Sequence, residues 1–215
     1  MIHFYENILK TSQIQVLEKL DFLGDDFYLA GGTALALQLG HRTSLDFDFY
    51  SKKKFGIESL STKFKSEFKS IDITTAVEDT LIAEIDGINF SLFYYPYQLL
   101  EDEPSFKSIK LASVADIAAM KMIAISMRGK SRDFIDVYYL LKKFDLEKIL
   151  EFTVKKYPNY EQMAILKGLI YFDEADKEED IKRGIQIFDK NFDWEKAKKE
   201  IVEKVEEYQT SLLQS

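Results

Sequence analysis

The stretch of the chain that decides the fold is residues 27–49, which read FYLAGGTALALQLGHRTSLDFDF. A short apolar run at 27–30 predicts a buried strand, and two glycines stop it. The next residues, 33–39, are rich in helix formers, and Gly40 is expected to end that helix. Acidic and apolar residues alternate over 45–50, which predicts a second strand. A strand, a glycine turn, a helix and an acidic strand are therefore expected in that order.

The two acids of the second strand, Asp46 and Asp48, are the candidate metal ligands. Alternate residues of a strand share one face, so both carboxylates should point the same way while Phe47 and Phe49 point into the core. Carboxylate oxygens favour Mg²⁺ or Mn²⁺ over zinc. The sequence therefore predicts that this pair binds one or two hard cations.

The glycine turn upstream is the candidate phosphate site. Gly31 and Gly32 allow the backbone to approach a ligand closely, and Thr33 could add a hydroxyl contact. The N-terminus of the following helix offers free N–H groups and a positive dipole end, both of which suit a phosphate. Taken alone, a glycine pair is a common turn and an Asp-x-Asp strand is a common solvated face. Their combination favours phosphoryl or nucleotidyl transfer.

The remainder of the chain predicts two domains. Alternation over 71–77, and on both sides of the hairpin signal Asp86–Gly87, predicts further strands. Helical patterns then dominate to the end of the chain. We therefore expect an α/β (α+β) fold, with a small mixed-sheet domain at 1–108 followed by a helical bundle at 109–215.

Composition excludes several classes of protein. The chain has 215 residues and a net charge of −8, which argues against broad nonspecific binding to nucleic acid. It has no cysteine, which excludes disulfide scaffolds, thiolate zinc sites and cysteine nucleophiles, and its two histidines argue against a histidine metal site. No apolar run is long enough to span a bilayer and no export signal is evident, so we expect a cytoplasmic protein with no membrane partner.

Two separated blocks of sequence resemble a known family. A small apolar residue, two glycines, 13 intervening residues and then Asp-apolar-Asp-apolar is similar to the signature of the nucleotidyltransferase superfamily. Residues 27–49 look like its AbiEii/AbiGii-type toxin branch, which includes toxins of type IV toxin–antitoxin systems. Residues 113–121 (SVADIAAMK) and 132–140 (RDFIDVYYL) are similar to later motifs of that branch.

The resemblance implies a nucleotidyltransferase-like domain and a magnesium-dependent transfer from a nucleoside triphosphate. It implies an acceptor hydroxyl on RNA (tRNA) or protein, and a cognate antitoxin. The roles that it assigns are metal ligation for Asp46 and Asp48, a phosphate cradle from Gly31, Gly32 and Thr33, phosphate contact for Arg42, triphosphate binding for Lys121, and an active-site acidic position for Asp133.

One departure from the family pattern leaves an alternative open. Many nucleotidyltransferases carry a third carboxylate on a later strand, but the matching strand here, 88–93, has no acid. Ser91 occupies the slot, and Glu84 on the preceding strand is the nearest substitute. The chain is therefore expected to be either a transferase that works with two acids or a catalytically silent nucleotide-binding or interaction module.

Two further groups of residues have both a structural and a functional interpretation. Six lysines (Lys52, Lys53, Lys54, Lys63, Lys65 and Lys69) against Glu58 and Glu67 give a local charge of +4 beside the acidic strand, which indicates either a solvated face or a contact with acceptor phosphates. The aromatic run at 93–97 indicates strand-end packing or, alternatively, base stacking.

Overall fold

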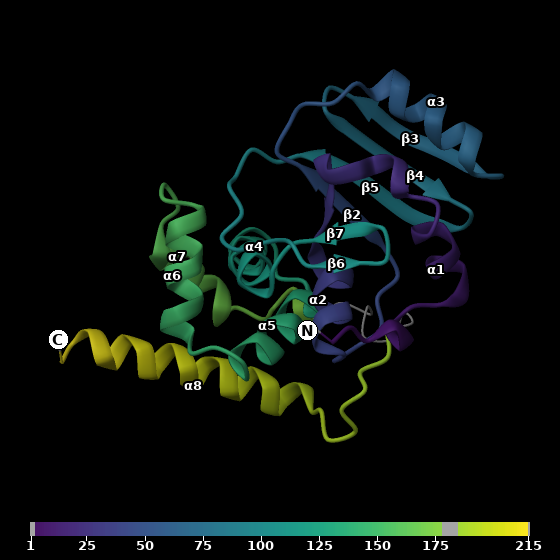
Figure 1. Ribbon diagram of the computed structural model, residues 1–215. Coiled ribbons are helices and arrows are strands. Elements are labelled where there is room, and N and C mark those ends of the chain that lie inside the picture. Colours follow the sequence, from purple (N-terminus) through teal and green to yellow (C-terminus); the bar gives the residue numbers. More distant parts are fainter. Residues whose placement is uncertain (1–2, 178–184, 215) are drawn as a thin grey trace. The chain divides into compact units, whose positions relative to one another are not determined.

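The computed structural model describes residues 3–177 and 185–214, and the chain divides into two compact units, Met1–Ser113 and Val114–Ser215 (Figure 1). The first unit is a mixed α/β unit and the second is helical. The predicted α/β fold class, with a mixed sheet followed by helices, is confirmed.

The first unit contains all the strands of the described residues. Seven strands form one sheet there, in the order β3-β4-β5-β2-β1-β7-β6. The elements of this unit are η1 (Glu6–Ile8), α1 (Thr11–Leu17), η2 (Asp21–Asp26), β1 (Tyr28–Leu29), α2 (Gly31–Leu39), β2 (Phe47–Ser51), α3 (Ile57–Glu67), β3 (Ile71–Val77), β4 (Thr80–Ile85), β5 (Ile88–Tyr94), β6 (Ser105–Phe106) and β7 (Ile109–Leu111).

The acidic strand β2 lies at the centre of the sheet. It pairs antiparallel with β1 and parallel with β5, while β3, β4 and β5 form an antiparallel meander. The turn between β4 and β5 has positive φ at Asp86 (47°) and Gly87 (80°), as the predicted two-residue hairpin requires. The β6–β7 hairpin was not predicted, and the expected domain boundary at 108 falls in its turn.

Fully buried aromatic residues form the core on one face of the sheet. Phe47 and Phe49 of β2 and Phe90 of β5 are fully buried, and Phe64 of α3 packs against Phe90 with ring centroids 5.1 Å apart. Figure 1 shows α3 alongside β3 at that edge of the sheet. The alternate residues of β2, including Asp48, are left on the opposite face, as the strand period dictates.

Helix α2 begins earlier than the sequence indicates. We expected a turn at the two glycines and a helix over 33–39, whereas Gly31 and Gly32 form the first turn of the helix itself. Gly31 has a φ of +64°, which favours glycine because it has no Cβ atom. Gly40, in the left-handed conformation (φ +66°), ends the helix as predicted, and its N–H donates to the carbonyl of Ala36.

The second unit is helical, and its helices α4 and α8 each pack against three others. Its elements are α4 (Val114–Met127), α5 (Ser131–Leu141), α6 (Leu146–Lys156), α7 (Gln162–Leu169), η3 (Ala175–Lys177) and α8 (Trp194–Leu212). Helices α4 and α8 each contact α5, α6 and α7. Asp193 caps α8, since its carboxylate accepts the N–H of Lys196 at 2.8 Å. Within the described residues, none of the helices combines the length and apolar character needed to cross a bilayer.

A buried ion pair joins two helices of this unit. Nζ of Lys156 on α6 lies 2.8 Å from Oδ1 of Asp116 on α4, and both side chains are completely buried. Burial of two charges is tolerated because each carries the other's counter-charge. Loss of one partner would therefore leave an uncompensated charge inside the helical unit.

Candidate active site

The structure places both acids of the predicted metal pair on the same side of the sheet. Asp48 lies within β2 between the buried Phe47 and Phe49, and Asp46 immediately precedes that strand. Both acids are half-buried, so their carboxylates are accessible without being fully solvated. In the parallel pairing with β5, Asp48 lies opposite Ser91, which is the position where the family pattern called for a third carboxylate.

The glycine turn lies directly against the carboxylate of Asp48. A Cβ atom placed on Gly31 would lie 3.1 Å from Oδ2 of Asp48, closer than almost all real contacts of that kind. Glycine is therefore required here both by the backbone conformation and by the approach of the acid. The first turn of α2 and the acidic strand consequently form one continuous surface.

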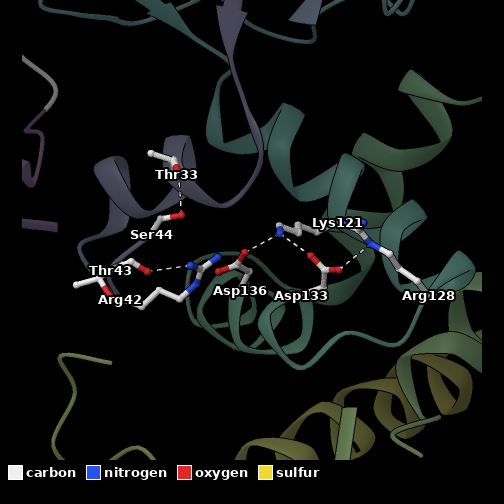
Figure 2. A network of polar contacts seen from close by, with 8 residues as sticks. All are labelled: Thr33, Arg42, Thr43, Ser44, Lys121, Arg128, Asp133 and Asp136. Atoms are coloured by element: carbon white, nitrogen blue, oxygen red, sulfur yellow. Dashed lines mark hydrogen bonds and ion pairs between the residues drawn. The ribbon is translucent and has the colours of Figure 1, made fainter. Parts of the chain in front are cut away.

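The second glycine lies against a guanidinium group. A Cβ atom on Gly32 would clash with Nη2 of Arg42, which is buried and donates from Nη1 to the carbonyl of Thr43 at 2.9 Å (Figure 2). The N-cap residue of α2 is Ala30, whose side chain makes no capping hydrogen bond. A cationic group and the positive end of a helix thus lie together, and both favour an anion such as phosphate at this turn.

Thr33 holds the loop that carries Asp46. Its side chain is buried, and its hydroxyl hydrogen-bonds to the backbone carbonyl of Asp46. The same hydroxyl oxygen lies 2.7 Å from Oγ of Ser44 (Figure 2). The structure therefore uses the Thr33 hydroxyl to position the segment before β2.

Asn89 is a site residue that sequence reasoning missed. Its Nδ2 donates to Oδ1 of Asp46 at 2.9 Å, from the position on β5 that precedes Phe90. Asn89 also lies opposite Glu84 in the β4–β5 pairing, so it stands between Glu84 and Asp46 in the row of residues that crosses the sheet. The register of the sheet was the only signal that could have found it.

A hard cation fits the donor set that these residues present. Two carboxylates supply oxygen ligands, and Mg²⁺ commonly binds through one or two carboxylates and completes its shell with phosphate oxygens and water. No cluster of three or more His, Asp or Glu side chains within 3–177 and 185–214 is arranged to hold a metal ion. The two carboxylates would leave the remaining coordination positions of such a cation to phosphate oxygens and water.

Two further predicted residues, Lys121 and Asp133, meet in the helical unit. Nζ of Lys121 on α4 lies 2.6 Å from Oδ1 of Asp133 and 2.7 Å from Oδ2 of Asp136, both on α5 (Figure 2). Nε of Arg128 lies 3.3 Å from the second oxygen of Asp133. All these side chains except that of Arg128 are buried. Two buried carboxylates of α5 therefore fix the position of the lysine side chain.

Three of the six lysines beside the acidic strand form ion pairs with neighbouring acids. Lys53 lies 2.6 Å from Asp26, Lys63 lies 2.8 Å from Glu67, and Lys54 lies 3.4 Å from Asp79. Two of these acids are distant in sequence from their partners, so the local charge of +4 did not include them. The pairs favour the solvated-face interpretation of this lysine group over a phosphate-binding surface.

Comparison with known proteins decides the family. The family model of the nucleotidyl transferase AbiEii toxin of type IV toxin–antitoxin systems matches residues 15–210. The chain belongs to the AbiEii nucleotidyltransferase toxin family. The match spans parts of both units, so the family model covers helices of the second unit as well as the sheet of the first. The expected family resemblance is confirmed.

Relatives of this AbiEii protein agree in length and fold. The uncharacterized protein aq_aa25 of Aquifex aeolicus (strain VF5) is 39% identical over 208 residues, which are 93% of this chain and 97% of that protein. A crystal structure of a candidate nucleotidyltransferase from H. pylori has a TM-score of 0.60 at 18% identity and covers 98% of each chain. JHP933 from Helicobacter pylori has a TM-score of 0.56 at 18% identity, covering 99% of this chain and 100% of that one. At these identities the two structures support the fold.

Proposed function

We propose that this AbiEii protein is a metal-dependent enzyme that moves a nucleoside monophosphate from a nucleoside triphosphate to an acceptor hydroxyl. Asp46 and Asp48 would hold Mg²⁺ or Mn²⁺. The N–H groups of the first turn of α2, at Gly31 and Gly32, bind phosphate oxygens together with Arg42. The bound cation would neutralise charge on the triphosphate.

The observation that carries this proposal is the contact between the glycine turn and the acid pair. Because the Asp48 carboxylate lies against Gly31, a cation on the acids and phosphates on the turn would be immediate neighbours. Phosphoryl-type transfer depends mainly on such positioning and on charge stabilisation. The guanidinium of Arg42 adds a fixed positive charge on the same turn.

The transfer step needs one bond to form and one to break. The acceptor hydroxyl oxygen attacks the α-phosphorus and loses its proton to water. The bond from the α-phosphorus to the bridging oxygen breaks, and pyrophosphate leaves with that oxygen. Arg42 and the α2 N-terminus stabilise the charge that develops on the departing phosphates. The later family motifs give Lys121 the role of a triphosphate ligand and Asp133 the role of its partner. Thr33 acts by positioning the segment that carries Asp46.

The acceptor and the partner follow from the family rather than from the geometry. We propose an acceptor hydroxyl on RNA, such as tRNA, or on a protein, and a cognate antitoxin that opposes the activity in the cytoplasm. The family match to a type IV toxin–antitoxin system supports the antitoxin.

The test is transfer of nucleotide labelled at the α-phosphate from each of four nucleoside triphosphates, with Mg²⁺ or Mn²⁺, to bulk RNA and to protein. Asp46→Asn should reduce transfer by at least about 100-fold, since the variant would lose the cation that neutralises charge on the triphosphate. Asp72→Asn is the matched control, because Asp72 is an exposed acid on β3 of the same sheet. Equal transfer by wild type and Asp46→Asn would refute the proposal.

A catalytically silent nucleotide-binding module is the second candidate. It is favoured by Ser91, which lies opposite Asp48 where a third carboxylate would support a second metal or a base. Calorimetric titration with a nucleoside triphosphate and Mg²⁺ separates the two functions. Binding that depends on Asp46, with no labelled product on any acceptor, would favour the silent module.

A further inference from the structure

A row of aromatic rings continues from the acid pair along the same face of the sheet. Tyr50 lies two residues after Asp48 on β2 and therefore shares its face. Its ring centroid lies 6.1 Å from that of Tyr28, 5.6 Å from that of Phe93 and 5.1 Å from that of Tyr95. The row extends to Tyr97, whose ring centroid is 4.9 Å from that of Tyr95.

Tyr28 is buried, but the other rings of this row are only partly covered, unlike the aromatic residues of the opposite face. Phe47, Phe49 and Phe90 are fully buried there and close the core. Tyr50, Phe93 and Tyr95 are half-buried, and Tyr97 is 42% exposed. Such partly exposed rings cluster beside a polar site, and a cluster of this kind is a candidate surface for a ligand with an aromatic face.

Asp46 and Asp48 lie between the glycine turn and the row of aromatic rings. β1 runs antiparallel to β2 with Tyr28 opposite Tyr50, and the chain then continues through Ala30 to Gly31 at the Asp48 end. The Cα atoms of Asp48 and Tyr50 are separated by about 7 Å along the strand. A nucleotide carries its base one sugar away from its phosphate, so a base attached to a reacting group at the acids could reach the rings.

We propose that Tyr50, Phe93, Tyr95 and Tyr97 form a stacking subsite for a nucleobase at the active site. This inference rests on the proposed function and extends it to the base. Stacking on aromatic rings is tolerant of sequence because every base presents a π-face. The base belongs either to the nucleoside triphosphate or to the terminal nucleotide of an RNA acceptor.

The experiment compares ligands with and without a base. Dissociation constants are measured with Mg²⁺ for three kinds of ligand. These are each nucleoside triphosphate, inorganic tripolyphosphate, and a short single-stranded RNA compared with the same RNA carrying abasic 3′-terminal sugars. Tyr97→Ala and Tyr95→Leu should weaken binding of at least one base-containing ligand by about 5- to 100-fold and leave tripolyphosphate unchanged. Tyr97→Phe should retain wild-type affinity, and Tyr171→Ala, at a tyrosine 54% exposed in the helical unit, is the matched control.

Each outcome decides the proposal. Weaker triphosphate binding alone assigns the base to the nucleotide substrate, and weaker RNA binding alone assigns it to the acceptor. Unchanged affinities for all base-containing ligands overturn the subsite, as does an equal loss for tripolyphosphate, which would make the rings structural. If wild type binds tripolyphosphate with Mg²⁺ no better than Asp46→Asn does, the proposed function fails instead, independently of the ring variants.

Discussion

At the scale of single residues, Asp46 is held from two directions. The Thr33 hydroxyl bonds to its backbone carbonyl, and the Asn89 amide donates to its carboxylate at 2.9 Å. A carboxylate that must meet a cation gains from such contacts because they fix its orientation before the metal binds. Asn89 is exposed and contributes no core packing, so its contact with Asp46 is open to a direct test.

Asn89→Ala should weaken Mn²⁺ binding about 10- to 100-fold, as is typical when a partner of a metal ligand is removed. Titration of the bound ion by electron paramagnetic resonance measures this, and nucleotide transfer should fall in parallel. Asn159→Ala makes the same change at an exposed position of the helical unit and should have no effect. Wild-type Mn²⁺ affinity in Asn89→Ala would show that this hydrogen bond does not orient the acid.

Gly32 supports a second prediction because a side chain there would displace Arg42. Gly32→Ala should lower affinity for tripolyphosphate about 10- to 100-fold, the loss expected for one charge-assisted contact. Calorimetry measures the affinity, and circular dichroism checks the fold. Gly56→Ala is the control, because a Cβ atom there meets only Ser59, at an acceptable 3.4 Å. Equal affinity for Gly32→Ala and Gly56→Ala would contradict a phosphate role for Arg42.

The residues of the candidate site differ in how far the sequence could predict them. The common face of Asp46 and Asp48 follows from the two-residue period of a strand, which is a local property. The contact of Asn89 with Asp46 depends on the parallel register between β2 and β5, which no local pattern encodes. The ion pairs of Lys53 and Lys54 likewise depend on acids brought together by the fold, so a charge count along the sequence missed them.

At the scale of elements, the length of each strand decided whether the sequence could predict it. Strands β3, β4 and β5 have six or seven residues, enough for alternation to show, and Asp86–Gly87 marks their turn. Strands β6 and β7 have two and three residues, too few to show a period. The predicted start of α2 is wrong because glycine usually breaks a helix, whereas here the left-handed backbone of Gly31 and its close contact with Asp48 favour glycine in the first turn.

The contact between α4 and α6 gives a prediction about stability. Lys156→Met would leave the Asp116 carboxylate buried without its counter-charge, so the free energy of unfolding should fall by about 3–5 kcal/mol. Urea unfolding of the full chain measures the change. Lys155→Met, one residue away and exposed, should change the free energy by less than about 0.5 kcal/mol.

A double substitution separates the charge from the packing. Asp116→Leu with Lys156→Met removes both charges and should recover most of the stability lost in Lys156→Met, because apolar replacements of a buried pair are often neutral. If the double variant is as unstable as the sum of the two single variants, the pair is not coupled and the stability of this contact has another origin.

At the scale of the whole molecule, the family match and the two polar networks point to one activity. Residues 15–210 match the AbiEii family, and this range includes parts of both units. The acid pair and the glycine turn lie in the sheet unit, and the ion pairs of Lys121 lie in the helical unit. Phosphoryl-type transfer depends on several charged groups held in position together rather than on one nucleophile. Loss of a single acid should therefore abolish the biological effect.

Growth of a bacterial host tests that consequence. Induction of the wild-type chain should arrest growth, since a toxin that transfers nucleotides acts on acceptors throughout the cell. Asp46→Asn should permit normal growth at equal protein level, while Asp72→Asn, an equal loss of charge on the same sheet, should arrest growth like the wild type. Colony counts after induction, with immunoblots for abundance, measure the effect. Arrest by Asp46→Asn would mean that toxicity arises from binding rather than transfer, and would favour the silent module.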